Sequence, residues 1–265
     1  MNFQEREVIL SLSTVPERLC NADENLNPCM SIRSLLNLNF KNYEIHFNIP
    51  FINKKTGKNY IIPDWLASLE KESSKLKIFR CEDYGPPTKI IPTLIRVKNP
   101  EAYIIVFDDD HAYAEDVIEQ HLIKHELYQN SVLGFAGLCS GDPNLYFCTS
   151  VQCDTEVQIM EHYKSVSYKR KYFKEDFFEE FVGKSWNDDV LLGAYMGKHK
   201  IRKIVLNYEK ETNFHPRSNS YPIIRSVYHQ NRDSGCDNFR LSNDDSKVME
   251  FISKGYLNLE SKKNK

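Results

Sequence analysis

The stretch Tyr103-Ile104-Ile105-Val106-Phe107-Asp108-Asp109-Asp110 decides the fold of this chain. Five apolar or aromatic residues run directly into three consecutive carboxylates. A continuous apolar run of this kind predicts a strand that is buried on both faces, as at the centre of a parallel sheet. Unpaired carboxylates cannot lie in a core, so the acid triplet is predicted at the carboxyl end of the strand. Open α/β sheets bind their ligands at that edge.

The acid triplet also indicates which kind of ligand the edge would bind. Clustered hard oxygen atoms that are too few to close a site suit a divalent cation that also binds phosphate oxygens. A solvated acidic loop is the alternative for any Asp-Asp-Asp sequence. The buried-strand run that precedes this triplet favours a site for a metal ion and a diphosphate.

The composition is that of an ordinary globular protein. A length of 265 residues, 41% of them hydrophobic and 27% charged, suits one sizeable domain or two small ones. The net charge of -2 gives no electrostatic reason to expect nucleic acid as a partner. The seven cysteines include no Cys-x-x-Cys pair, which indicates reduced thiols rather than a disulfide framework or a zinc site.

The chain shows no signal for a membrane or for export. No window is apolar over the length needed to span a bilayer, and residues 1–7 are not a signal peptide. We therefore expect no transmembrane segment and a cytoplasmic protein, located in the host cytoplasm or the virion if the source is viral. The oligomeric state is left open.

Strand and helix patterns alternate along the first half of the chain. The expected strands besides the run at residue 103 are Val8–Ser13, Tyr43–Ile49 and Leu76–Arg80. The expected helices are Pro28–Leu38, one that begins at Pro63, Ile90–Val97 and Ala114–Leu127. This βαβ spacing predicts an α/β fold with a mostly parallel central sheet that is flanked by helices.

The pattern changes after Val132. Leu133–Leu138 is a strand whose glycines indicate close backbone approach, and Leu145–Cys148 is expected to pair back antiparallel to it. These segments predict a small antiparallel portion on the acceptor side of the sheet. Residues 174–182 are expected to form a lid helix, and a further strand and a final helix are expected at Ile201–Leu206 and Leu241–Leu259.

Several further side chains are expected near the acid triplet. Arg18 follows the first strand and would share its edge with the triplet, although an ordinary surface arginine is an equally good interpretation. Lys89 lies at a helix start, where the helix dipole disfavours a cation unless an anion is bound. His215 or His229 would complete a metal shell, although an isolated histidine is more often not a ligand.

A second acidic stretch is Trp186-Asn187-Asp188-Asp189-Val190. Asn187 or Asp188 can cap the helix that follows, which is the simplest interpretation of these residues. Beside a metal site, a carboxylate at this helix start can also act as a general base. Asp189 is the first choice for that role and Asp188 the second.

These stretches together resemble glycosyltransferases of the GT-A fold, in particular a widespread group of bacterial and viral glycosyltransferase-like proteins. The matching segments occur in the expected order over about the first 200 residues. They are Leu12-Ser13-Thr14-Val15-Pro16-Glu17-Arg18, Glu82-Asp83-Tyr84-Gly85-Pro86-Pro87-Thr88-Lys89, Ile105-Val106-Phe107-Asp108-Asp109-Asp110 and Trp186-Asn187-Asp188-Asp189-Val190.

The resemblance implies that the donor is a nucleotide-diphosphate sugar, a UDP-sugar in the first instance, and that the cofactor is Mn²⁺ or Mg²⁺. It implies that Asp108 lies on the ribose side and also near the metal, that Asp110 binds the metal, and that Asp109 assists. The remaining implied roles are a base pocket lined by Thr14, Pro16 and Arg18, a position near the base or ribose for Asp83, and a donor-facing position for Lys89.

The resemblance also implies an inverting transfer to a glycan or another hydroxyl acceptor, with Asp189 removing the acceptor's proton. Many relatives carry Glu-Asp where this chain has Asp188-Asp189, a difference that keeps the charge and shortens one side chain. One domain is expected over residues 1–260, followed by a disordered tail at 261–265. Residues 1–112 would bind the nucleotide sugar, and residues 113–260 would hold the acceptor and the catalytic acid.

Two other functions remain open. A sugar nucleotidyltransferase shares the sheet and the acid-bound metal, but it normally has a glycine-rich phosphate loop, and residues 11–20 contain no glycine. A non-catalytic module that binds nucleotide sugars would have a degenerate active site, whereas both acidic stretches are intact here.

Overall fold

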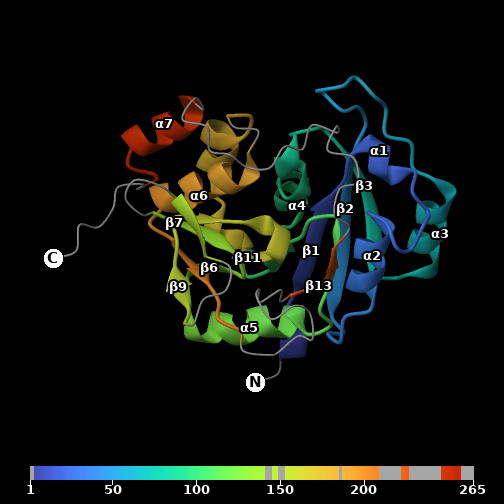
Figure 1. Ribbon diagram of the computed structural model, residues 1–265, viewed down its shortest axis with the longest axis horizontal. Coiled ribbons are helices and arrows are strands. Elements are labelled where there is room, and N and C mark those ends of the chain that lie inside the picture. Colours follow the sequence, from blue (N-terminus) through green and yellow to red (C-terminus); the bar gives the residue numbers. More distant parts are fainter. Residues whose placement is uncertain are drawn as a thin grey trace.

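An eight-stranded mixed sheet forms the centre of the protein (Figure 1). The computed structural model describes residues 3–140, 145–148, 153–184, 187–208, 222–226 and 246–257. In spatial order the strands are β3 (Leu76–Cys81), β2 (Tyr43–Pro50), β1 (Val8–Ser13), β4 (Tyr103–Val106), β11 (Val166–Lys169), β6 (Ser131–Gly134), β12 (Arg202–Val205) and β9 (Thr155–Glu156).

The order of the strands confirms the predicted mostly parallel sheet. Strands β3, β2, β1 and β4 are all parallel, so their carboxyl ends share one edge. Strand β11 lies antiparallel between β4 and β6, β12 is parallel to β6, and β9 is antiparallel to β12. All four residues of β4 are buried, as the apolar run before the acid triplet predicts.

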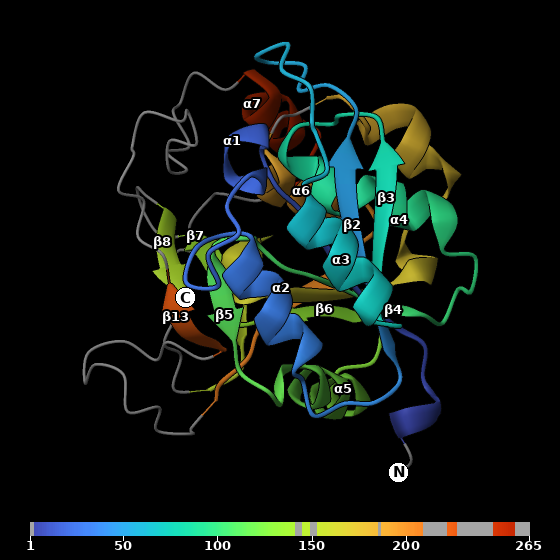
Figure 2. The ribbon, with the colours of Figure 1, turned by 90° about the vertical axis from the view of Figure 1, so that its right-hand side faces the viewer.

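Helices cover both faces of this sheet (Figure 2). One face packs against α2 (Cys29–Leu36), α3 (Asp64–Glu72) and α5 (Val117–Leu127). The other face packs against α4 (Ile91–Arg96), α6 (Asp188–Lys198) and α7 (Ser246–Ser253). Alternate residues of β1 divide between the two layers: Leu10 and Leu12 pack on the first side, and Ile9 packs on the second. The shorter helical segments are η1 (Phe3–Glu5), α1 (Pro16–Leu19), η2 (Pro86–Lys89), η3 (His162–Lys164) and η4 (Arg170–Tyr172).

Two small antiparallel sheets complete the described fold and confirm the expected antiparallel portion. One consists of β10 (Ile159–Met160), β7 (Gly137–Ser140) and β8 (Leu145–Cys148), and the other of β13 (Ile223–Ser226) and β5 (His111–Tyr113).

The single strand expected over Leu133–Leu138 is instead divided between two sheets: β6 ends at Gly134 and β7 begins at Gly137. Both glycines are tightly surrounded. A Cβ atom at Gly134 would lie 2.8 Å from the Ser165 carbonyl oxygen, and one at Gly137 would lie 2.7 Å from that of Ile159.

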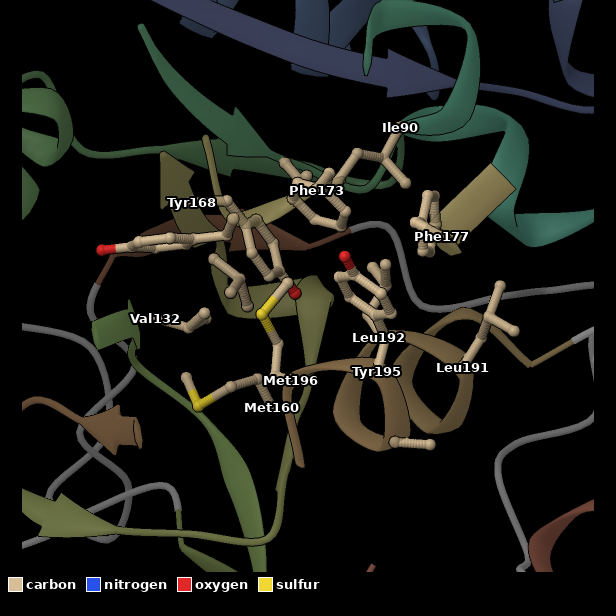
Figure 3. Close-up of a cluster of buried hydrophobic side chains, with 14 of the residues drawn as sticks. Ile90, Val132, Met160, Tyr168, Phe173, Phe177, Leu191, Leu192, Tyr195 and Met196 are labelled. Carbon is tan, nitrogen blue, oxygen red and sulfur yellow. The ribbon is translucent and has the colours of Figure 1, made fainter. Parts of the chain in front are cut away.

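Residues 174–182 contain the expected helix in a short form. They contain a π-helical turn, η5 (Phe177–Phe181), whose two terminal phenylalanines are buried in the core. The Tyr195 ring of α6 lies 4.9 Å from the Phe177 ring and 5.1 Å from the Phe181 ring, measured between centroids (Figure 3 shows Tyr195 and Phe177). The aromatic residues of this segment therefore serve to bury apolar surface against α6.

The structure describes the side chains of four of the seven cysteines. Cys20, Cys29, Cys81 and Cys153 are free thiols. None of the described helices has the length and apolar character needed to cross a membrane.

Candidate active site

The carboxyl ends of β1 and β4 bring together two of the stretches singled out from sequence. Thr14 directly follows β1, and its hydroxyl donates to Oδ2 of Asp109. Arg18, in the short helix α1 that begins at Pro16, forms an ion pair with Oδ1 of the same carboxylate. The Arg18 guanidinium also lies 4.0 Å from Asp110 Oδ2. The parallel arrangement of β1 and β4 accounts for this meeting, because both loops leave the sheet at the same edge.

Lys89 links the two acidic stretches. Its Nζ forms an ion pair with Asp108 and lies 2.8 Å from Asp188 Oδ2. Burial by itself would lower the pKa of Lys89, but the carboxylates of Asp108 and Asp188 reverse this and raise its pKa well above the ordinary value. The lysine therefore remains a cation inside the protein, with carboxylates as its counter-ions.

The sheet holds the backbone of Lys89 in place. Its carbonyl oxygen accepts hydrogen bonds from the Ser11 hydroxyl of β1 and from the Asn48 amide of β2, the latter at 3.3 Å. Thr93 of α4 also contacts both side chains, at 2.6 Å from Ser11 and 3.0 Å from Asn48. These buried polar residues therefore fix where the lysine side chain begins.

Asp83 organises the loop that precedes Lys89. It is 6% exposed, and its carboxylate accepts from the backbone N–H groups of Lys54 at 2.7 Å and Gly85 at 2.8 Å. Thr88 donates to it at 3.3 Å. Gly85 has a φ of +68°, which glycine adopts without a steric penalty. The structure thus gives Asp83 a role within the protein itself, and its proposed contact with the nucleotide remains a prediction.

Tyr113 connects the acid triplet to the segment between β10 and β11. Its hydroxyl accepts from the backbone N–H of Asp108 at 3.1 Å and donates toward the carbonyl oxygen of Tyr163 at 3.2 Å. The ring is 1% exposed. Residues 161–165 are thereby held next to the end of β4.

The second acidic stretch begins helix α6, as predicted. Asn187 is the N-cap, and its Oδ1 accepts from the Val190 backbone N–H at 2.9 Å. Asp188 and Asp189 occupy the first helical turn, where the helix dipole stabilises carboxylates. His162 contacts both acids: its Nδ1 lies 3.0 Å from Asp188 Oδ2 and forms an ion pair with Asp189 Oδ1.

The surroundings shift the pKa values of Asp188 and Asp189 in opposite directions. Burial would raise the pKa of Asp188, but Lys89 and His162 together hold its pKa far below the ordinary range. Burial and the neighbouring Asp188 charge instead raise the pKa of Asp189. A carboxylate that accepts protons readily is the better general base, so the electrostatics favour Asp189 over Asp188.

Several side chains at this site were not singled out from the sequence. Glu161 is 5% exposed, its Oε2 makes no hydrogen bond with the described residues, and burial together with Asp189 raises its pKa to about 8. Burial lowers the pKa of the nearby Lys164 to about 8. His162 and its partner Tyr168 are also buried. Residues 154–172 have neither a regular period nor a motif, so only their three-dimensional proximity to α6 identifies them.

The charges at the site suit a divalent cation. Five carboxylates, those of Asp108, Asp109, Asp110, Asp188 and Asp189, surround the three cations Arg18, Lys89 and His162, and His111 Nε2 lies 3.3 Å from Asp110 Oδ1. Burial raises the pKa of Asp110, and the adjacent Asp108 and Asp109 carboxylates add to the effect. Carboxylate oxygens are the ligands that Mg²⁺ and Mn²⁺ prefer, so Asp108 and Asp110 fit such an ion.

A second group of side chains also has the spacing of a metal site. Potential ligand atoms of His162, Asp188 and Asp189 lie within 4.8 Å of one another. Burial would lower the pKa of His162, but Asp189 and Asp188 raise it to about 9. In the structure the imidazole forms ion pairs with both carboxylates. The other two candidate ligands, His215 and His229, lie outside the described residues.

Comparison with known proteins identifies the fold. No protein-family model and no curated protein matches the sequence. The solved structure of Staphylococcus aureus TarS 1-349 in complex with UDP matches 77% of this chain and 58% of its own, with 13% identity and a TM-score of 0.50. A second structure of S. aureus TarS matches 77% of this chain and 35% of its own, with 14% identity and the same TM-score of 0.50.

The mixed sheet and its helical layers thus form an α/β fold that is similar to that of S. aureus TarS. The chain spans less than two thirds of the length of either TarS chain that it matches.

Proposed function

We propose that this protein is a metal-dependent glycosyltransferase of the GT-A type. It would transfer a sugar from a nucleotide-diphosphate sugar, in the first instance a UDP-sugar, to a hydroxyl acceptor with inversion at the anomeric carbon. The structural similarity to a protein that was solved with UDP supports this choice of donor.

The observation that carries the proposal is the bridge formed by Lys89. One ammonium group contacts Asp108 of the triplet and Asp188 of the helix start, two acids that are 80 positions apart in the sequence. A group of acids that would bind a metal and a group that would supply a base therefore meet at the edge where open α/β sheets bind ligands. A purely structural acidic loop would not need this arrangement.

Different residues of the site would bind different parts of the donor. Thr14, Pro16 and Arg18 would contact the base side of the donor, and Asp108 and Asp110 would hold Mn²⁺ or Mg²⁺. When bound, the ion offsets the charge that develops on the leaving diphosphate. Lys89 adds a fixed positive charge beside the same edge.

Asp189 would act on the acceptor side. Its carboxylate takes the proton of the acceptor hydroxyl while that oxygen forms a bond to the anomeric carbon and the bond to the diphosphate breaks. Help from a general base is typically worth about two to four powers of ten in rate. The raised pKa of Asp189 supports its assignment over Asp188.

A donor panel tests the proposal. The protein is incubated with UDP-glucose, UDP-galactose, UDP-GlcNAc or GDP-mannose, each with Mn²⁺, and release of the nucleoside diphosphate is followed. Slow hydrolysis of one donor is expected, because water substitutes for the missing acceptor. If no donor is bound in calorimetry, the protein is not a glycosyltransferase; binding without any turnover would identify a binding module.

The Asp189→Asn variant tests the assignment of the base. It should keep the donor affinity of the wild type and lose about two to four powers of ten in turnover, because the amide cannot accept the proton. Asp188→Asn provides a comparison, since its carboxylate is already neutralised by Lys89 and His162. Equal turnover by the wild type and Asp189→Asn would rule out Asp189 as the base.

A further inference from the structure

Among the described residues, His162 supplies both hydrogen-bond contacts to the Asp189 carboxylate. The backbone N–H of His162 donates to Asp189 Oδ1 at 3.2 Å, and the Nδ1 of the same histidine contacts the same oxygen. No other hydrogen bond to this carboxylate comes from the described residues. Oδ1 is therefore anchored by two donors, while Oδ2 accepts no hydrogen bond from the described part of the chain.

The imidazole of His162 is itself fixed on its far side. Its Nε2 lies 2.8 Å from the Tyr168 hydroxyl, and the two rings are stacked at 6.0 Å with an interplanar angle of 26°. Tyr168, labelled in Figure 3, is 1% exposed. It belongs to β11, the strand between β4 and β6. The histidine is thus clamped between the central sheet and helix α6, with its own side chain 1% exposed.

We propose that His162 is the positioning residue of the catalytic base: it anchors Oδ1 of Asp189 and leaves Oδ2 to take the acceptor's proton. The inference rests on the proposed function, since it assumes that Asp189 is the base. His162 keeps its own proton on Nδ1 throughout, and the acceptor's proton ends on Oδ2. The bond that forms is the glycosidic bond, and the bond that breaks is the one between the anomeric carbon and the diphosphate.

The surrounding charges explain why a histidine suits this position. Asp188 and Asp189 of α6 face the imidazole, and Lys89 touches Asp188 from the other side. Two neighbouring carboxylates repel each other and tend to share a proton. A cation between them favours the ionised form of both, so His162 opposes the effects of burial and of Asp188 on Asp189 and orients its carboxylate before the acceptor arrives.

The same arrangement limits the useful pH range at its upper end. Burial opposes the charge on His162, whereas Asp189 and Asp188 favour it, and the resulting pKa is about 9. The other titratable groups near the ring are Tyr168 on β11 and Glu161, the residue that precedes it. Above about pH 9 the imidazole becomes neutral, so its hold on Asp189 weakens.

Donor hydrolysis tests the inference. The UDP-sugar that the wild type hydrolyses fastest is used with Mg²⁺ between pH 6 and pH 10. His162→Phe removes both side-chain contacts, and its turnover number should fall about tenfold to a hundredfold with an unchanged KM for the donor. His162→Gln retains an N–H donor and should recover part of the rate, but without the loss of rate above about pH 9.

His199→Gln is the matched control. His199 also contacts an aspartate, with Nε2 2.9 Å from Asp176 Oδ2, but at the opposite end of α6. The turnover and pH profile of His199→Gln should equal those of the wild type. Thermal melting of each variant verifies that the protein is folded.

A spectroscopic measurement reports on the contact without requiring turnover. The imidazole signals of His162, assigned by their loss in His162→Gln, should titrate near pH 9 in the wild type and at lower pH in Asp189→Asn, which has lost the neighbouring negative charge.

The outcomes separate the two proposals. A wild type that hydrolyses no donor and binds no UDP–Mg²⁺ overturns the proposed function and the inference with it. A wild type that hydrolyses donor, beside a folded His162→Phe variant of equal turnover, overturns the inference alone. An unchanged histidine titration in Asp189→Asn would do the same.

Discussion

Replacing Lys89 by methionine should destabilise the protein and do so in a manner that depends on pH. The change keeps the length of the side chain and removes the ammonium group that contacts Asp108 and Asp188. The side chains of Lys89 and Asp188 are 12% and 10% exposed, so water cannot take the place of the lost cation at Asp188. Breaking a buried ion pair from one side typically costs about 3–5 kcal/mol.

The loss of stability expected for Lys89→Met lies near the lower end of that range. Asp188 retains His162 as a second cationic partner at 3.0 Å, and Asp108 is 29% exposed and can be rehydrated in part. We therefore expect a loss of about 3 kcal/mol in the free energy of unfolding at pH 7. Because the lost ammonium no longer holds the pKa of Asp188 down, Asp188 can take up a proton in the folded variant, and the difference from wild type should shrink as the pH falls below about 5.

Urea denaturation followed by circular dichroism measures the effect. Lys58→Met is the control, because Lys58 makes a comparable contact with Glu17 at 2.6 Å, but the two side chains are 60% and 40% exposed. That exposed pair should contribute about 0–1 kcal/mol. The double variant Lys89→Met/Asp188→Asn should be less destabilised than the sum of its single variants, since the unpaired charge at Asp188 is then absent.

Two results would contradict the role of Lys89 as the counter-ion of Asp108 and Asp188. If Lys89→Met and Lys58→Met lower the free energy of unfolding equally at pH 7, Lys89 is not the counter-ion of buried carboxylates. A double variant whose loss equals the sum of the single losses would exclude a direct interaction between Lys89 and Asp188.

Three further predictions follow from other parts of the structure. Asp110→Ala should weaken Mn²⁺-dependent UDP binding in calorimetry and leave metal-free UDP binding unchanged; unaltered UDP–Mn²⁺ affinity would argue against Asp110 as a ligand. His121 is fully buried, and burial lowers its pKa to about 3, so between that pH and the unfolded value of about 6.5 the unfolded chain binds the extra proton. Stability should therefore fall with decreasing pH by about 1.4 kcal/mol per unit more steeply in the wild type than in His121→Gln, and parallel curves from denaturation at pH 5 to 6.5 would contradict this. In helix α6, Gly197→Ala should lower the melting temperature, because its Cβ would lie 1.8 Å from the Tyr256 carbonyl oxygen, whereas Gly193→Ala, whose nearest atom is 3.3 Å away, should be tolerated; a Gly197→Ala variant as stable as Gly193→Ala would refute the close contact.

The local sequence pattern was sufficient to predict the α/β layers of the fold. The alternation of apolar strands with amphipathic helices specified the mostly parallel sheet, and the Asp-Asp-Asp triplet marked the carboxyl end of β4. Both depend on residues that are close together in the chain: side-chain burial follows the period of each element, and carboxylates are excluded from the core. Asn187 could be predicted as a candidate N-cap of α6 for the same reason.

Local pattern failed where the outcome depends on packing between distant segments. The aromatic residues at 174–182 suggested a lid, but the apolar surface of α6 buries them. Leu133–Leu138 was expected to be one strand, but it divides between two sheets because the backbones of Ser165 and Ile159 approach its glycines closely.

The amino-acid sequence by itself determined which residues are strand, helix and acid, since these properties arise from neighbours along the chain. The tertiary structure alone decided that Lys89 joins Asp108 to Asp188, and that His162, from a segment with no motif, holds Asp189. The opposite pKa shifts of Asp188 and Asp189 belong to this second group, and they support Asp189, which was also the first choice from sequence. The proton affinity of a carboxylate is set by burial and by charges within a few ångströms. Apart from the mutual effect of the adjacent Asp188 and Asp189, those charges come from Lys89 and His162, which are 26 to 100 positions away in sequence.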